Sequence, residues 1–204
     1  MKKITMITLI LLIATFEVKA QDLEVGFGMG TGAAYMYEHN DSSIDIDYSL
    51  PFSSYLDLKY SKPDSYFGLK LKFQYINAGI EGRNWKNSNE PIDGDVSSLT
   101  SMILLEHLKD GNKWNFGYNF GFGYTRQEFR RDLINLSPAV VSNFMSVNFS
   151  GIISSKLNEN LTLQMEPTLF WTDPVGSLRD SDKWQIAGED VSILMQVGIK
   201  YKIN

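Results

Sequence analysis

The stretch "WNFGYNFGFGY", residues 114–124, places an aromatic ring at every second position, with only glycine or asparagine between the rings. Successive side chains of a β-strand point to opposite faces of the sheet. The stretch therefore predicts a strand with one wall of rings and one face of very small side chains. A soluble β-sandwich would bury the rings but would normally expose charged or bulky polar groups on its other face. A strand with lipid on one side and a crowded lumen on the other accounts for both faces.

Residues 1–20 have the pattern of a secretory signal peptide. Two lysines precede an apolar run at residues 4–16, and the small or apolar residues Val18 and Ala20 stand three and one positions before a plausible cleavage site. The apolar run is too short for a good membrane-spanning helix. We therefore expect residues 21–204 to form the exported, mature domain.

The composition narrows the class of protein further. The chain contains no cysteine and has a formal net charge of −5. An exported chain without cysteine must be stabilised by backbone pairing and burial rather than by disulfides. The acidic balance argues against nucleic acid as a partner. No segment after the leader reaches the about 20 consecutive apolar residues that a spanning helix needs, so this chain can cross a membrane only as a barrel.

Alternation of apolar and polar residues predicts eight strands in the mature domain. They cover residues 23–35, 52–60, 67–75, 99–108, 114–124, 141–155, 161–171 and 191–203. The fourth strand is ambiguous because Met102, Leu104 and Leu105 follow one another too closely to define two faces. We assign Ile103 and Leu105 to its outer face and Glu106 to its inner face.

The connections between these strands alternate in length. Short turns at residues 61–65, 109–113 and 157–160 alternate with long polar segments at residues 36–48, 78–96, 125–138 and 172–190. An up-and-down sheet gathers all its short turns at one end and all its long loops at the other. Outer-membrane barrels have this arrangement, with short periplasmic turns and longer extracellular loops. The sequence therefore predicts an all-β fold, an eight-stranded antiparallel up-and-down transmembrane β-barrel.

Aromatic residues stand where the predicted strands would meet the two membrane surfaces. Ten strand steps of about 3.3 Å, tilted by about 40°, rise roughly 25 Å, which is the height of the apolar band of such barrels. We expect two aromatic girdles at the ends of this span. The periplasmic girdle would contain Tyr60, Trp114 and Tyr201, and the extracellular girdle Tyr35, Tyr75, Tyr124 and Trp171.

Charged residues on the polar faces of the strands would point into the lumen. They are Glu24, Asp57, Lys59, Lys70, Lys72, Glu106, Glu166 and Lys200. The interior of an eight-stranded barrel is only wide enough to be filled by side chains, and buried charges need partners. We expect a structural ion-pair network that plugs the barrel. The alternative is a narrow or gated ion path, for which inward glycines of the first and fifth strands would leave space for water.

The chain resembles the small eight-stranded outer-membrane barrels of the OmpA/OmpX type, and specifically the β-barrel proteins common in Bacteroidetes. The matching parts are the signal "MKKITMITLILLIATFEVKA", the opening strand "LEVGFGMGTGAAY", the glycine-aromatic strand and the closing "VGIKYKIN". The resemblance implies a Gram-negative outer-membrane protein that is inserted by the barrel assembly machinery. Barrels of this type commonly end on an aromatic residue that the assembly machinery recognises. This chain ends on Asn204, so we expect the machinery to recognise Tyr201 instead.

The resemblance also implies a structural or interaction role, such as envelope integrity, adhesion, or contact with lipopolysaccharide or an extracellular protein partner through the loops. It implies no cofactor and no metal. Arg126, Arg130 and Arg131 are candidates for lipopolysaccharide contact because guanidinium groups bind phosphates bidentately. The loop aromatics Trp85, Phe129 and Trp184 are candidates for contact with a protein partner.

Three alternatives stay open: a small porin-like channel or transporter, a lipid-modifying enzyme and a soluble periplasmic binder. An enzyme would need a base beside a nucleophilic hydroxyl. The two histidines are His39, which lies near Ser42, and His107, which shares a predicted strand with Ser98 and Ser101. Neither forms a His-x-Ser arrangement on an outer strand, so we do not expect catalysis.

Overall fold

The computed structural model describes residues 22–36, 44–62, 65–84, 90–91, 93–109, 111–131, 140–174 and 190–203. The predicted signal peptide, residues 1–20, lies outside this part of the chain. The strands are β1 (Asp22–Met36), β2 (Ile44–Tyr48), β3 (Phe52–Ser61), β4 (Phe67–Asn84), β5 (Glu90–Pro91), β6 (Gly94–Lys109), β7 (Asn115–Arg131), β8 (Val140–Lys156), β9 (Leu161–Thr172) and β10 (Asp190–Ile203).

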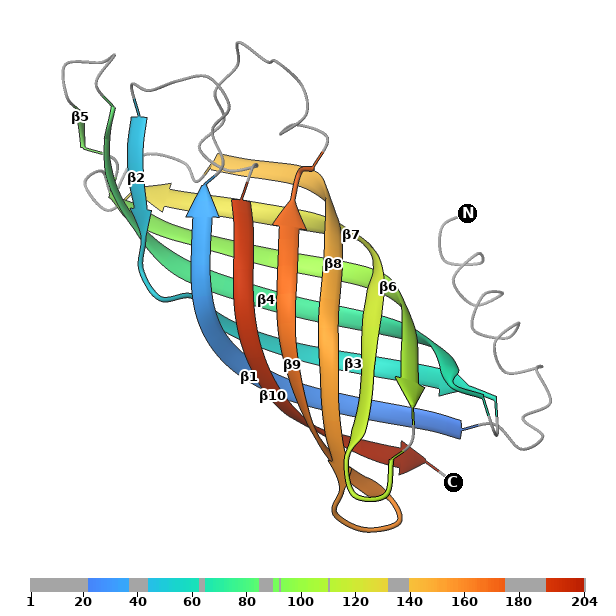
Figure 1. Cartoon of the computed structure of the whole chain (residues 1–204). Helices are drawn as coiled ribbons and strands as arrows, with labels where there is room; N and C mark the ends of the chain where they lie inside the picture. Colours follow the sequence, from blue (N-terminus) through green and yellow to red (C-terminus); the bar gives the residue numbers. More distant parts are fainter. Residues whose placement is uncertain are drawn as a thin grey trace, which may run out of the picture.

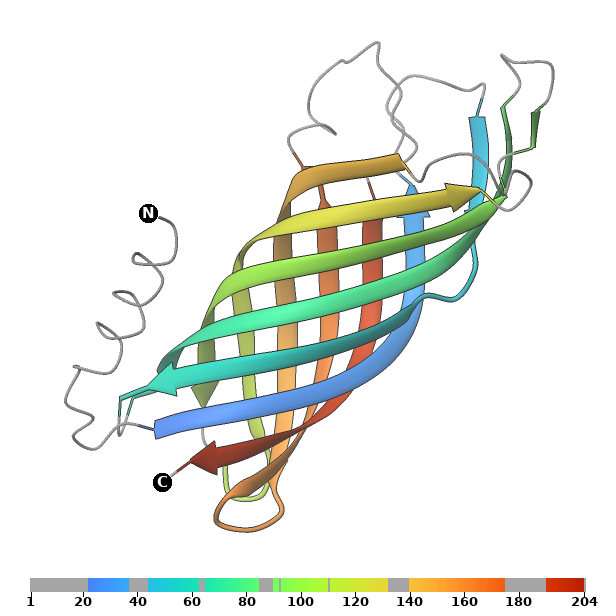
Figure 2. The ribbon, with the colours of Figure 1, turned by 180° about the vertical axis from the view of Figure 1, so that it is seen from behind.

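Eight of these strands close into an antiparallel barrel. Going round the wall, the order is β1, β3, β4, β6, β7, β8, β9 and β10, and every neighbouring pair is antiparallel. The barrel closes because β1 also pairs with β10, in a register that runs from Leu23 opposite Ile203 to Met36 opposite Asp190. Figures 1 and 2 show the strands wrapping obliquely around a common axis. The predicted eight-stranded antiparallel barrel is confirmed.

The two remaining strands extend the wall at the end opposite Asp22 and Ile203. β2 pairs with residues 80–84 of β4, beyond the point at which β3 begins at Phe52, and so continues the wall where β3 does not reach. The two-residue strand β5 pairs with the same end of β4. We call this end the long-loop end, and the end that carries Asp22 and Ile203 the short-turn end.

The prediction that residues 78–96 and 125–138 are loops was wrong for much of both segments. β4 continues to Asn84, β6 begins at Gly94, and β7 continues to Arg131. The reason is that buried side chains still fill the inward positions in these segments, among them Ile80 and Phe129, each 1% exposed, and the polar residues Thr125 and Gln127. The outward positions become polar because the wall has passed beyond the apolar band, and water does not prevent backbone ladders from continuing. Likewise, residues 36–48 contain β2.

The stretch that decides the fold lies on β7 and has the expected two faces. Its five rings at positions 116, 118, 120, 122 and 124 are between 43% and 60% exposed, and Trp114 just before the strand is 46% exposed. The intervening Asn115, Asn119 and Gly121 are buried. Soluble monomers rarely expose an apolar surface of this extent. The outer wall is therefore suited to contact with lipid.

The inward glycines do not leave space for water, contrary to the expectation above. A Cβ atom at Gly28 or Gly198 would overlap the side chain of Tyr55, which lies across both positions. On β7, a Cβ atom at Gly121 would overlap the carbonyl group of Ile103 on the neighbouring strand. These inward positions are therefore occupied by glycine because a ring or a neighbouring backbone already fills the volume that a side chain would need.

Candidate functional site: the filled lumen

Glu106 of β6 is the centre of an ion-pair cluster in the half of the lumen nearest the short-turn end. Its carboxylate lies 2.5 Å from the Lys70 ammonium of β4, 2.9 Å from Lys59 of β3 and 3.3 Å from Lys200 of β10. Glu106 and Lys70 have no exposed surface. One carboxylate therefore joins three strands of the wall across the interior.

Glu166 of β9 forms the second centre of the cluster. Its two oxygens accept hydrogen bonds from Lys70 and Lys72, each at 2.9 Å, and it is also hydrogen-bonded by Gln164. Lys72 donates a further bond of 2.8 Å to Gln196, and its ammonium lies 4.2 Å from the centre of the Tyr55 ring. Lys70 contacts both carboxylates, so the two centres form one connected cluster.

Two further carboxylates complete what we call the charge network. Asp57 lies 3.8 Å from Lys70, and Glu24 lies 3.5 Å from Lys59. The structure thus brings together all eight charged residues that the sequence places in the lumen, and these are four lysines and four carboxylates. The network is neutral, as the burial of so many charges requires.

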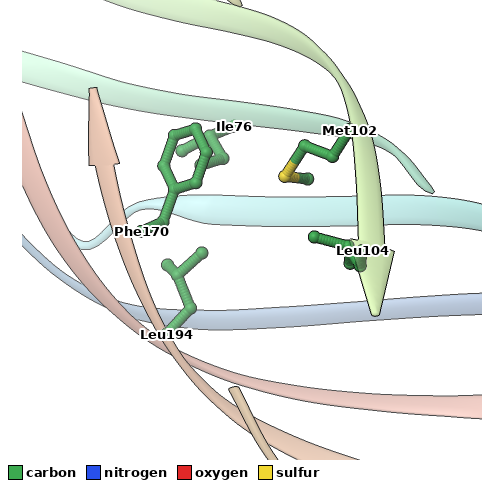
Figure 3. Close-up of a cluster of buried hydrophobic side chains, with 5 residues drawn as sticks. All are labelled: Ile76, Met102, Leu104, Phe170 and Leu194. Atoms are coloured by element: carbon green, nitrogen blue, oxygen red, sulfur yellow. The ribbon is translucent and has the colours of Figure 1, made fainter. Parts of the chain in front are cut away.

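The lumen also contains an apolar cluster, which the sequence analysis did not predict. Ile76, Met102, Leu104, Phe170 and Leu194 point toward one another across the barrel and form a cluster that we call the apolar layer (Figure 3). Each is at most 7% exposed. Apolar residues at inward positions were the sequence signal for this layer, but the ambiguous run in the fourth predicted strand hid two of them.

Hydroxyl and amide groups fill other parts of the interior. Thr125 is hydrogen-bonded to Thr100 at 2.8 Å and also to Ser146, and Ser150 is hydrogen-bonded to Thr168 at 2.9 Å. All five side chains are buried. These contacts join β6, β7, β8 and β9 within the interior.

The seven aromatic residues expected in the girdles all lie at outward positions. At the short-turn end these are Tyr60, Trp114 and Tyr201, and toward the other end Tyr35, Tyr75, Tyr124 and Trp171. Six of them are exposed and Trp171 is partly exposed. Tyr75 and Tyr124 lie within β4 and β7 rather than at strand ends, because these strands continue beyond the aromatic level.

Arg126 and Arg130 lie on the outer face of β7 beyond Tyr124, and not in a loop as expected. Glu128 stands between them, 2.7 Å from Arg130 and 3.8 Å from Arg126. The side chain of Arg126 is 59% exposed and that of Arg130 is 73% exposed. The side chain of Arg131 lies outside the described part of the structure.

The other candidates from the sequence are not brought together. His107 lies on the outer face of β6 among Phe67, Tyr118 and Tyr66, with ring centres 4.9, 5.1 and 6.2 Å away respectively. Ser98 is buried on the opposite face of the same strand. His39, Trp85 and Trp184 lie outside the described residues. Phe129 is buried inside the barrel, so it was wrongly assigned to a surface for partner contact.

Two further features are absent from the described residues. No group of three or more histidine, aspartate or glutamate side chains is placed there to hold a metal ion. No helix in the described ranges has the length and apolar character needed to cross a bilayer.

The closed wall, the apolar outer face and the filled lumen define a small barrel of the outer-membrane type. Solved structures with this fold include Ail of Yersinia pestis in complex with the heparin analogue sucrose octasulfate, at 11% identity and a TM-score of 0.55, with 91% of this chain and 100% of that chain covered. OprG of Pseudomonas aeruginosa is 13% identical with a TM-score of 0.60, and the match covers 91% of this chain and 96% of OprG. Neisserial surface protein A is 11% identical with a TM-score of 0.57, and the match covers 91% of this chain and 98% of that protein.

At these identities the likeness concerns the fold alone. No family model matches the sequence, and no curated protein matches it either. The narrower resemblance to the Bacteroidetes-type barrels is not supported by these comparisons.

Proposed function

We propose that this protein is an integral outer-membrane barrel with a closed lumen, which serves as an envelope anchor and presents its long-loop end outside the cell. The observation that carries the proposal is the filling of the lumen by a neutral charge network and an apolar layer. In this proposal, residues 1–20 are the cleaved signal peptide, the barrel assembly machinery inserts the chain, and the aromatic residues named above form the two girdles.

A filled lumen opposes ion flow in two ways. An ion that entered the charge network would have to displace Lys70 or Lys72 from carboxylates at 2.5–2.9 Å. It would then have to shed its water to pass the apolar layer, and transfer of a bare ion into such a medium costs many kcal/mol. Catalysis is not part of the proposal, because the neighbours of His107 on the outer face pack against it ring on ring.

We expect the purified barrel to produce no unitary current steps in a planar lipid bilayer. A porin of about 16 strands, which has an open aqueous channel, serves as the positive control for insertion and recording. Insertion of this barrel is verified separately by its heat-modifiable migration after recovery from the bilayer lipid. Steady unitary steps whose size changes in Lys72→Gln would show that ions pass the network, and would replace this proposal by the channel alternative.

We also propose that Arg126 and Arg130 contact phosphate groups of lipopolysaccharide. They follow Tyr124 on the outward face of β7, so they lie at the level at which head groups cover the girdle. Ail, with the same fold, was solved with a sulfated sugar, whose oxyanions resemble phosphates in charge and geometry. An extracellular protein partner at the long-loop end is a further part of the proposed interaction role.

Replacement of both arginines, Arg126→Gln with Arg130→Gln, is expected to weaken lipopolysaccharide binding by about tenfold, because two charge-assisted contacts are lost. Binding is measured with the barrel immobilised in nonionic detergent at low and at physiological salt. The matched control is Lys109→Gln with Lys113→Gln, which removes the same charge from exposed positions at the other end. An equal loss of binding in both double variants would mean that only overall charge matters.

A further inference from the structure

The short-turn end of the lumen opens into a cavity of about 380 Å³ that we call the vestibule. Its lining comes from all eight strands of the barrel and from the turns between them. Its floor is the side of the charge network that faces the short-turn end, where Lys59 and Lys200 form ion pairs with Glu106. Because eight-stranded outer-membrane barrels have their short turns in the periplasm, the vestibule faces the periplasm.

The lining of the vestibule is strongly basic, in a chain that is acidic overall. Five lysines, which are Lys59, Lys62, Lys156, Lys200 and Lys202, face only two carboxylates, Glu24 and Glu159. The two lysines of the floor are balanced by carboxylates of the charge network. The positive excess therefore comes from the rim, where Lys62 and Lys156 are exposed. A concave wall with one sign of charge concentrates counter-ions.

A buried hydroxyl also points to a ligand in this cavity. Ser154 of β8 lines the vestibule and is 1% exposed, yet its Oγ atom has no hydrogen-bond partner among the described residues. A buried polar atom without a partner is uncommon and calls for an explanation. A bound group with acceptor oxygens would satisfy the Ser154 hydroxyl. The bound group would also accept hydrogen bonds from Lys200, because its ammonium has three protons and donates one of them to Glu106.

We propose that the vestibule is a binding site for a phosphate-type oxyanion on the periplasmic side of the membrane. Ser154 and Lys200 contact the anion at the floor, and Lys62 and Lys156 attract it at the rim. The anion is either a free phosphate compound or the head group of a phospholipid that reaches over the rim. This proposal goes beyond the closed-lumen function, because the charge network below the vestibule closes the barrel whether or not the anion is bound.

The test is titration calorimetry of the folded mature barrel in phospholipid-free nonionic detergent, with inorganic phosphate as the probe. We expect one phosphate per barrel. Lys62→Gln with Lys156→Gln is expected to weaken the affinity by about tenfold through loss of two rim charges. Ser154→Ala is expected to weaken it by a similar factor through loss of a bond to a charged group. Because the Ser154 hydroxyl has no protein partner among the described residues, this variant should keep the stability of the parent.

The matched control is again Lys109→Gln with Lys113→Gln, which changes two exposed lysines of the same end that do not line the vestibule. Absence of binding at millimolar phosphate, or equal weakening in both lysine pairs, would overturn the proposal. A second titration compares barrels in nanodiscs of phosphatidylglycerol and of phosphatidylcholine. A lower phosphate affinity in phosphatidylglycerol supports the site with a lipid head group as occupant, and equal affinities support it with a free phosphate compound.

Discussion

Glu106→Gln is expected to lower the free energy of unfolding by about 3–5 kcal/mol, because it leaves three buried lysines without their shared carboxylate. Lys59, Lys70 and Lys200 all lie within 3.3 Å of Glu106. Glutamine has nearly the same shape, so the loss measures charge and not packing. The measurement is urea unfolding of the barrel in vesicles, followed by tryptophan fluorescence and by the loss of heat-modifiable migration.

Two further variants identify the physical cause of this loss. Glu128→Gln removes a partly exposed carboxylate on the outer face that pairs with Arg130, and it should change stability by no more than about 1 kcal/mol. Addition of Lys70→Met to Glu106→Gln restores a neutral lumen and should recover a large part of the stability, since Lys70 is the lysine nearest to Glu106. If Glu106→Gln were as stable as the parent, the charge network would contribute nothing to the fold.

Phe120→Arg is expected to destabilise the barrel by about 2–4 kcal/mol, the range known for a basic residue on the lipid face near the bilayer midplane. Phe120 lies near the middle of the aromatic stretch, is 43% exposed on the outer face, and packs edge to face with Phe122 at 5.2 Å between ring centres. The measurement is the same urea unfolding in vesicles. Phe120→Leu keeps an apolar side chain and isolates the contribution of the lost ring.

The depth dependence of this effect gives the decisive control. Val141 is also outward and is 44% exposed, but it pairs with Glu128 beyond the level of Tyr124. Val141→Arg should therefore change stability by only about 0–1 kcal/mol. If the two arginine variants were equally tolerated, or if the parent were soluble without detergent, the apolar face would not be a lipid contact.

The alternation of residue types was sufficient to predict most of the wall. A strand points side chains to alternate faces whatever its neighbours are, so a local pattern decides which face each residue belongs to. For this reason the sequence placed the rings of β7, the lysines of β4 and Glu106 on their observed faces. Short and long connections were likewise readable in the sequence and predicted the up-and-down order.

The ends of the strands were harder to predict from the sequence. Polar outward residues in the second half of β4 and in β7 look like loop residues, because the outer face of a barrel changes from lipid to water along one continuous strand. Buried inward residues such as Ala78, Ile80 and Phe129 show that the wall continues. The role of the inward glycines also depended on the fold, since Tyr55 comes from a different strand and lies across Gly28 and Gly198.

The sequence by itself determined that this chain forms an eight-stranded barrel with an apolar outer wall and charged residues inside, because those properties follow from a two-residue period within each strand. Only the tertiary structure decided which charges meet. Lys70 and Glu166 are 96 residues apart and touch at 2.9 Å because the stagger between strands and the closure of β1 on β10 set their heights in the lumen. The apolar layer and the vestibule have the same origin, since each is assembled from single residues of several strands.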